Sequence, residues 1–188
     1  KEGAENAPAY RGLAYVVFER LPLADFGNRV PQFTFEVVRP VAGLGHMIRA
    51  VDLIPGASEF AYDPAPRIRV LAPGVSDSEN RHQLFASSDA VASLDALVAL
   101  CPNLERVALV VSWFGTDLRA GQCRCEPRVE SWDKATTGDP WTVGGLGRVL
   151  CQPVSRVDGR PAYGGTAADH AVIRLIAELR GRGIEVAL

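Results

Sequence analysis

The second half of the chain carries the pattern that most restricts the fold. The run Arg106-Val-Ala-Leu-Val-Val-Ser-Trp is almost continuously apolar, as in a parallel strand covered on both faces. A long excursion over 114–163 precedes apolar residues at helical spacing over 166–183 and a strand-like stretch at 184–188. Strand, excursion, helix and strand form one βαβ unit, whose right-handed crossover is expected to place the excursion above the carboxyl end of the first strand. In (β/α)₈ barrels that end is the functional face.

Two helices have recognisable ends in the sequence. Ser87 or Ser88 is predicted to cap a helix that starts just after them. Thr166 and Asp169 have the spacing of a capping box, in which each end of the motif satisfies a backbone N–H of the first turn. Gly183 stands where a helix commonly ends on a glycine with positive φ.

The first part of the chain is richer in strand patterns. Residues 13–19 and 33–38 are predicted to form a pair of strands, joined by a loop that Pro22 and Pro31 stiffen. Apolar residues over 43–54 recur at helical spacing, which predicts a short amphipathic helix. A rigid loop between paired strands suits a protein that presents a fixed surface to neighbouring subunits, because such a loop loses little entropy on docking.

Beyond this helix, the alternation in Arg67-Ile-Arg-Val-Leu predicts another strand, and the Pro-, Gly- and Ser-rich stretch 72–82 predicts a linker or surface loop. Taken together, these patterns predict a mixed fold, α+β or α/β, in two parts. The expected parts are a β-rich segment at 1–72, a linker at 73–86 and an incomplete α/β unit at 87–188.

The two ends of the sequence predict a piece of a longer polypeptide. Lys1 is not an initiator methionine. At the other end, a strand that stops at Leu188 would present unpaired backbone groups along its edge. We therefore expect further chain beyond both ends.

Charge and hydropathy argue against two classes of partner. The formal net charge is −2, and Lys and Arg are spread along the chain without a basic cluster, so sequence-specific nucleic-acid binding is not expected. No apolar run approaches the ~18 residues that a membrane span needs, so no transmembrane segment is expected. The hydrophobic content of 47% suits a packed globular core.

The cysteines are predicted to be free thiols. A bridge within Cys123-Arg-Cys125 would be strained by its one-residue spacing. No second close Cys/His pair completes a four-ligand zinc site, and no metal or cofactor is expected. The four cysteines are Cys101, Cys123, Cys125 and Cys151.

Aromatic and acidic residues beyond the apolar strand are the candidate catalytic residues. Aromatic platforms beside carboxylates are typical of a sugar site, where one carboxylic acid protonates the glycosidic oxygen and a second acts as base or nucleophile. The alternative is that the carboxylates are solvated charges or caps and that the tryptophans anchor the loop. The candidates are Trp113, Asp117, Glu126 and Glu130, with Asp133, Trp132 and Trp141 nearby.

Three stretches resemble a known family. Residues 10–37, Tyr-Arg-Gly-Leu-Ala-Tyr-Val-Val-Phe-Glu through Phe-Gly-Asn-Arg-Val-Pro-Gln-Phe-Thr-Phe-Glu-Val, are similar to a segment that recurs in tail-hub proteins of tailed phages and gene transfer agents. Residues 101–121, beginning Cys-Pro-Asn-Leu-Glu-Arg-Val, and Arg160-Pro-Ala-Tyr-Gly-Gly-Thr resemble the TIM-barrel-like domain of the large gene-transfer-agent baseplate protein, often called megatron.

This resemblance implies a structural virion protein of the tail tip. Residues 1–72 would be a tail-hub segment, and 87–188 would open a glycosidase-like TIM-barrel domain. The expected partners are other tail and baseplate proteins, with a homotrimeric hub, contact with glycans of the host envelope and a part in DNA delivery. One alternative is a glycoside hydrolase that acts on cell-wall or surface glycans; another is a carbohydrate-binding module without acid/base groups.

Overall fold

The computed structural model describes residues 16–27, 29–35, 43–54 and 59–188. The chain divides into two compact units, Lys1–Val37 and Val38–Leu188. The fold is mixed α and β, with several small sheets and, in the described part, three α-helices. None of the helices within these residues is long and apolar enough to cross a bilayer.

The first unit is held by stacked phenylalanines. Phe18 and Phe33 stack with their ring centroids 4.1 Å apart, and Phe35 lies 6.0 Å from Phe33. A 3-10 helix, η1 (Leu23–Phe26), follows Pro22. The described residues of the predicted pair, 16–19 and 33–35, form no strand, and the rest of those two runs lies outside the described residues.

The second unit is organised around a parallel three-stranded sheet. Strands β1 (Ala50–Leu53), β4 (Arg106–Leu109) and β14 (Glu185–Ala187) lie in the order β1-β4-β14, in agreement with the predicted βαβ pairing of the last two. The register aligns Val51 with Val107, and Val107 with Val186.

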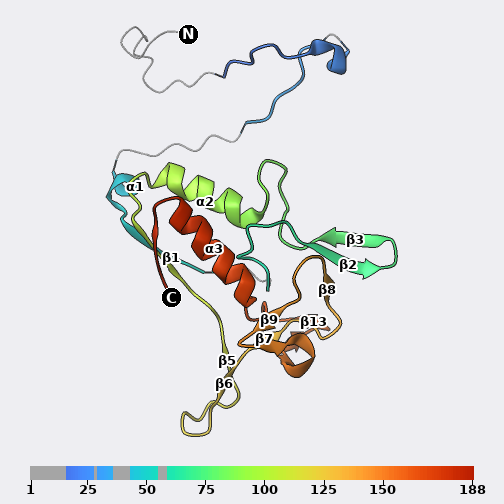
Figure 1. Ribbon diagram of the computed structural model, residues 1–188, viewed down its shortest axis with the longest axis vertical. Helices are drawn as coiled ribbons and strands as arrows, with labels where there is room; N and C mark the ends of the chain where they lie inside the picture. The colour runs from blue at the N-terminus through green and yellow to red at the C-terminus, as the bar shows by residue number, and fades with distance from the viewer. Residues whose placement is uncertain (1–15, 28, 36–42, 55–58) are drawn as a thin grey trace. The chain divides into compact units, whose positions relative to one another are not determined.

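Two helices make the crossovers between these strands. Helix α2 (Asp89–Leu100) leads into β4 and helix α3 (Asp169–Gly181) leads into β14. Two successive right-handed crossovers in one direction place both helices on the same face of the sheet, and Figure 1 shows α2 and α3 side by side. Their apolar side chains form one core with the sheet: Leu94, Val107, Leu109, Leu175 and Leu179 are buried together.

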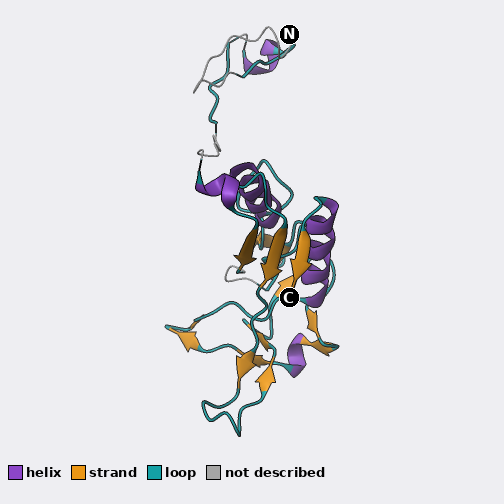
Figure 2. Ribbon diagram, turned by 90° about the vertical axis from the view of Figure 1, so that its left-hand side faces the viewer, coloured by secondary structure: helices purple, strands orange, loops and turns teal. Residues whose placement is uncertain are grey.

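The long segments after β1 and β4 fold into small sheets at the carboxyl end of the main sheet, where Figure 2 shows the strands pointing. Here β2 lies between β3 and β8, β7 pairs in parallel with β11, and β5–β6, β9–β10 and β12–β13 are antiparallel pairs. The bounds are β2 (Ile68–Ala72), β3 (Val75–Ser78), β5 (Phe114–Gly115), β6 (Cys125–Glu126), β7 (Arg128–Val129), β8 (Ala135–Thr136), β9 (Thr142–Val143), β10 (Leu146–Gly147), η2 (Arg148–Leu150), β11 (Gln152–Pro153), β12 (Arg156–Val157) and β13 (Arg160–Pro161).

Several predicted ends and strands are confirmed. Ser88 is the N-cap of α2, and its side chain accepts a hydrogen bond from the Val91 N–H. Gly183 follows α3 with φ of 78°. The strands predicted near 67–71 and 184–188 are β2 and β14. All four cysteines are free thiols, as expected.

Three local predictions are wrong. Helix α1 covers only Leu44–Met47, and Ala50–Leu53 of the predicted helix form strand β1, because their backbone pairs with β4. The segment 72–82, predicted as a linker or surface loop, contains strand β3. The division of the chain at 73–86 stays a prediction. The capping box is absent: Thr166 accepts a hydrogen bond from the Arg128 N–H, and Asp169 accepts one from the Gly144 N–H.

Candidate functional site

A buried tyrosine fixes the segment after β1 at the carboxyl edge of the main sheet. The Tyr62 hydroxyl lies 2.6 Å from the Leu53 carbonyl oxygen and 2.9 Å from that of Val110. Burial raises the pKa of Tyr62 to about 12. The hydroxyl therefore stays protonated and links the ends of β1 and β4, and the neighbouring acidic residues are held at the edge where parallel α/β proteins bind ligands.

Glu59 is the most enclosed carboxylate at this edge. Its side chain is fully buried and accepts hydrogen bonds from both terminal nitrogens of Arg148, at 2.9 and 2.6 Å. It also accepts one from the Glu130 N–H at 2.7 Å. A bidentate pair of this kind fixes both side chains in orientation as well as in position.

Lys134 joins Glu59 to two further carboxylates. Its ammonium donates to Glu130 Oε2 at 2.7 Å and to Glu79, and it lies 3.8 Å from Glu59 Oε2. The Lys134 side chain is only 1% exposed, so these carboxylates replace the water that it loses. We call Glu59, Glu79, Glu130, Lys134 and Arg148 the Lys134 cluster.

Burial shifts the pKa of Glu130 within the Lys134 cluster. Three carboxylates face two cations, so the cluster is neutral when one carboxyl group is protonated. Loss of solvent raises the pKa of Glu130, although Lys134 opposes the shift. Glu130 Oε1 is buried and has no hydrogen-bond partner within the described residues. Glu130 therefore holds its proton to a higher pH than an ordinary exposed glutamate does.

A second ion-pair network surrounds the fully buried Asp63. Its carboxylate accepts from Arg67 Nε at 2.7 Å and from Arg174 Nη1 at 3.1 Å. Arg174 also pairs with Asp139 and holds the pKa of that carboxyl group below its usual value. His170 Nε2 lies 3.8 Å from the Asp63 carboxylate, and desolvation lowers the pKa of this imidazole.

Phe60 separates and supports the two networks. Its ring is fully buried, with the Arg67 guanidinium 5.4 Å and the Lys134 ammonium 5.9 Å from its centroid. The backbone of Gly165 lies directly against the Glu59 carboxylate, because a Cβ at position 165 would be 2.7 Å from Glu59 Oε1. A side chain at position 165 would therefore collide with the Lys134 cluster.

An open pocket of about 400 Å³ adjoins the Lys134 cluster. We call it the Glu130 pocket. A hydrogen bond from the Ser131 hydroxyl and the charges of Arg156 and Arg69 lower the pKa of Asp133. Two carboxyl groups with opposite pKa shifts, Glu130 and Asp133, therefore line one pocket, the arrangement in which one carboxyl group can serve as an acid and the other as a base. The pocket is lined by Arg69, Glu130, Ser131, Asp133, Lys134, Arg156, Pro161, Ala162 and Tyr163.

The pocket contains only some of the candidates from the sequence. Asp117 lies in the turn between β5 and β6, where Arg119 pairs with it at 2.7 Å and lowers its pKa. Trp113, just before β5, is half exposed, and Glu126 pairs with Arg128 at 3.3 Å. None of these three candidates lines the Glu130 pocket. Their catalytic roles stay predictions.

The nearby tryptophans have structural partners. Trp141 is buried, and its indole N–H donates to the Thr166 carbonyl oxygen at 2.8 Å. The Trp132 indole N–H donates to the Cys151 carbonyl oxygen at 2.7 Å while much of the ring remains exposed. These contacts match the interpretation that tryptophans anchor the excursion.

Sequence reasoning missed Glu59, Arg148 and the role of Lys134. One signal was available: Lys134 is one of only two lysines in a chain whose other eighteen basic residues are arginines. Glu59 gave no signal, because Arg148, its bidentate partner, lies 89 positions further along the chain.

Compared with known proteins, the chain matches no family model and no curated protein.

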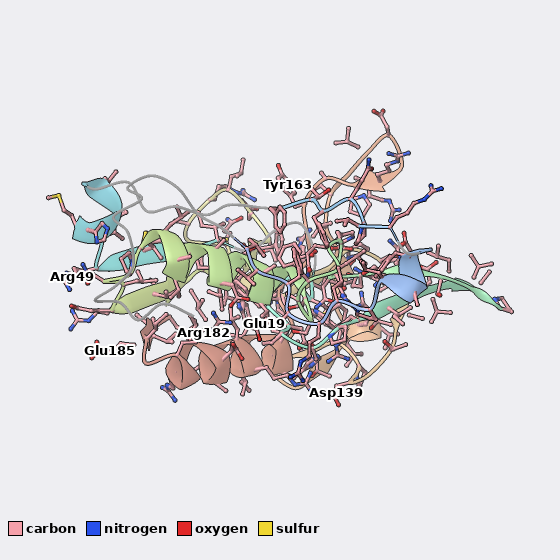
Figure 3. All side chains as sticks on the ribbon, turned by 90° about the horizontal axis from the view of Figure 1, so that it is seen from above. Glu19, Arg49, Asp139, Tyr163, Arg182 and Glu185 are labelled. Carbon is pink, nitrogen blue, oxygen red and sulfur yellow. The ribbon has the colours of Figure 1, made fainter. Side chains whose placement is uncertain are left out.

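In the described part of the chain, no group of three or more His, Cys, Asp or Glu side chains is placed to hold a metal ion. At the carboxyl edge, the ion pairs of the Lys134 cluster lie beside a polar pocket. Figure 3 shows Tyr163 and Asp139 away from the end of the second unit where Arg49 and Glu185 lie together.

Proposed function

We propose that the chain is a structural virion protein of a phage-like tail tip or gene transfer agent baseplate, and that it forms part of a threefold hub. The observation that carries the proposal is the set of buried ion pairs in the second unit. Buried carboxylates such as Glu59 and Asp63 are bound in ion pairs that connect segments far apart in sequence. Such groups stiffen a scaffold, and the resemblance of residues 10–37 to tail-hub proteins supports the same role.

The first unit supports assembly with other tail and baseplate proteins. Its large apolar side chains remain exposed, with Val30 at 74%, Val17 at 66% and Phe35 at 54%. Aromatic and aliphatic surface of this kind is typical of protein interfaces. We place the hub contacts, including those of a homotrimer, on this unit.

The sheet supports the proposal that the second unit opens a TIM-barrel-like domain. Its three parallel strands lie side by side in the same order as they occur along the chain, and both crossover helices cover one face of the sheet, as in a barrel. The opposite face carries the exposed residues Asp52, Arg106 and Glu185. In a complete barrel that face would point inward.

Electron cryomicroscopy of particles that contain this chain tests the hub role. We expect its density in a threefold ring around the tail channel. Because Phe33 is central to the exposed stack, Phe33→Ser is expected to reduce incorporation into particles, whereas Phe85→Ser in the second unit serves as the matched control. Density elsewhere than the tail tip, or a chain that remains monomeric and outside particles, would refute the hub.

A glycoside hydrolase is the second candidate, and one observation favours it. Glu130 and Asp133 line the same pocket with opposite pKa shifts, as a general acid and its partner carboxylate require. We expect release of reducing ends from cell-wall glycans, with losses of about 100-fold or more in Glu130→Gln and Asp133→Asn. Glu105→Gln, at an exposed ion pair, is the control. Unchanged release in both pocket variants would exclude this mechanism.

A further inference from the structure

We propose that the Glu130 pocket binds a saccharide that carries a carboxylate, with Arg69 and Arg156 facing the negative charge and Tyr163 against the sugar ring. This names the ligand class for the envelope contact. Its biological setting rests on the proposed tail-tip function, whereas binding itself rests on the pocket alone.

Two guanidinium groups supply the anion-binding part of the pocket. The Arg69 side chain is exposed on β2 and makes no hydrogen bond within the described residues. Arg156 donates through Nε and Nη2 to the Gly159 carbonyl oxygen, at 3.1 and 2.8 Å, which fixes its direction and leaves Nη1 available. A planar guanidinium matches a carboxylate through paired N–H donors, and an arginine already held in place loses little entropy on binding.

The balance of charge around the pocket favours an anion. Lys134 is neutralised by the carboxylates that surround it. By contrast, Arg69 and Arg156 line the pocket and form no ion pair within the described residues. A ligand with one carboxylate would supply the ion-pair partner that these guanidinium groups lack.

The rest of the lining favours a sugar over a small inorganic anion. Tyr163 is 65% exposed at the pocket, so its ring offers an apolar face to the C–H side of a pyranose. The Asp133 carboxylate can accept hydrogen bonds from sugar hydroxyls. The pocket volume of about 400 Å³ lies within the range of small-molecule sites, roughly 300–1,000 Å³. Inorganic phosphate would leave the ring and much of this space unused.

Calorimetric titration of the 188-residue chain tests the proposal. The probes are oligogalacturonate and sialyllactose, the same compounds with their carboxyl groups converted to methyl esters, and inorganic phosphate. We expect at least one acidic saccharide to bind and its methyl ester to bind about 10-fold more weakly or not at all, because an ester carries no charge for the guanidinium groups. Arg69→Gln and Arg156→Gln are each expected to weaken binding by about 10-fold.

Arg124→Gln is the matched control, because Arg124 is exposed and lies outside the pocket. The proposal is overturned if neither acidic saccharide binds, if the methyl esters bind equally well, or if both pocket variants bind as the control does. Full competition by inorganic phosphate at equal concentration would show a plain anion site and also overturn it. Binding that survives while the chain fails to enter particles would refute the proposed function and leave this inference standing.

Discussion

Glu59→Gln is expected to lower the free energy of unfolding by about 3 kcal/mol, because it leaves the buried Arg148 guanidinium without a negative partner. The substituted amide keeps the size of the side chain but turns an N–H₂ group toward donors that need an acceptor. The side chain of Glu59 is fully buried, so water cannot replace the lost charge. Urea denaturation with an unchanged m-value measures the loss.

The exposed pair of Arg49 and Glu105 provides the matched control for this variant. Both side chains are 58% exposed, and they lie 2.8 Å apart. Glu105→Gln is expected to cost under about 1 kcal/mol, since exposed pairs gain little over hydration. Equal losses at the buried and exposed positions would contradict the importance assigned to the Lys134 cluster.

A double variant distinguishes the stability lost by leaving one charge unpaired from the stability lost with the contact itself. Glu59→Gln combined with Arg148→Met removes both members of the bidentate pair. We expect the double variant to lose less stability than the sum of the two single variants, because neither charge of the pair is then left alone. Strict additivity would mean that the two side chains do not stabilise each other in the folded protein.

Sequence patterns correctly predicted the structural features that depend only on neighbouring residues. Ser88 caps α2 with its own side chain, and Gly183 supplies the positive φ after α3, so both positions could be found from their neighbours alone. The run at 106–113 was recognised as a strand from its apolar and β-branched residues. Its predicted cover on both faces is wrong, because Val107 and Leu109 are buried while Arg106, on the other face of β4, is exposed. These features depend on the identity of a few consecutive residues.

The failures occurred where a distant partner decides the outcome. The four residues of β1 are too short a run to distinguish strand from helix, and their pairing with β4 settles the matter. Thr166 was assigned to a capping box, but its hydroxyl accepts from the Arg128 N–H, 38 positions earlier. For the same reason, the sequence indicated acidic residues in the excursion but not which of them would share a pocket.

Lys134→Met is expected to cost about 3–5 kcal/mol at neutral pH, because it removes the ammonium that three carboxylates face. Methionine fills a similar volume, so the loss reports charge more than packing. Arg49→Met removes a cation from the exposed pair and is expected to cost under about 1 kcal/mol. Chemical denaturation at a series of pH values measures both.

The pH dependence distinguishes loss of charge from simple misfolding. Desolvation already raises the pKa of Glu130 above its ordinary value of 4.5, and Lys134 opposes that shift, so removing the ammonium raises the pKa further. A carboxyl group with a raised folded-state pKa contributes stability that is present below its unfolded-state pKa and lost as pH rises through the folded-state pKa. The stability gap between wild type and Lys134→Met should therefore widen as pH rises from the raised folded-state pKa of Glu130 in wild type to the still higher folded-state pKa in the variant. Parallel pH profiles would show that the carboxylates do not depend on Lys134, and the charge balance assigned to the cluster would be wrong.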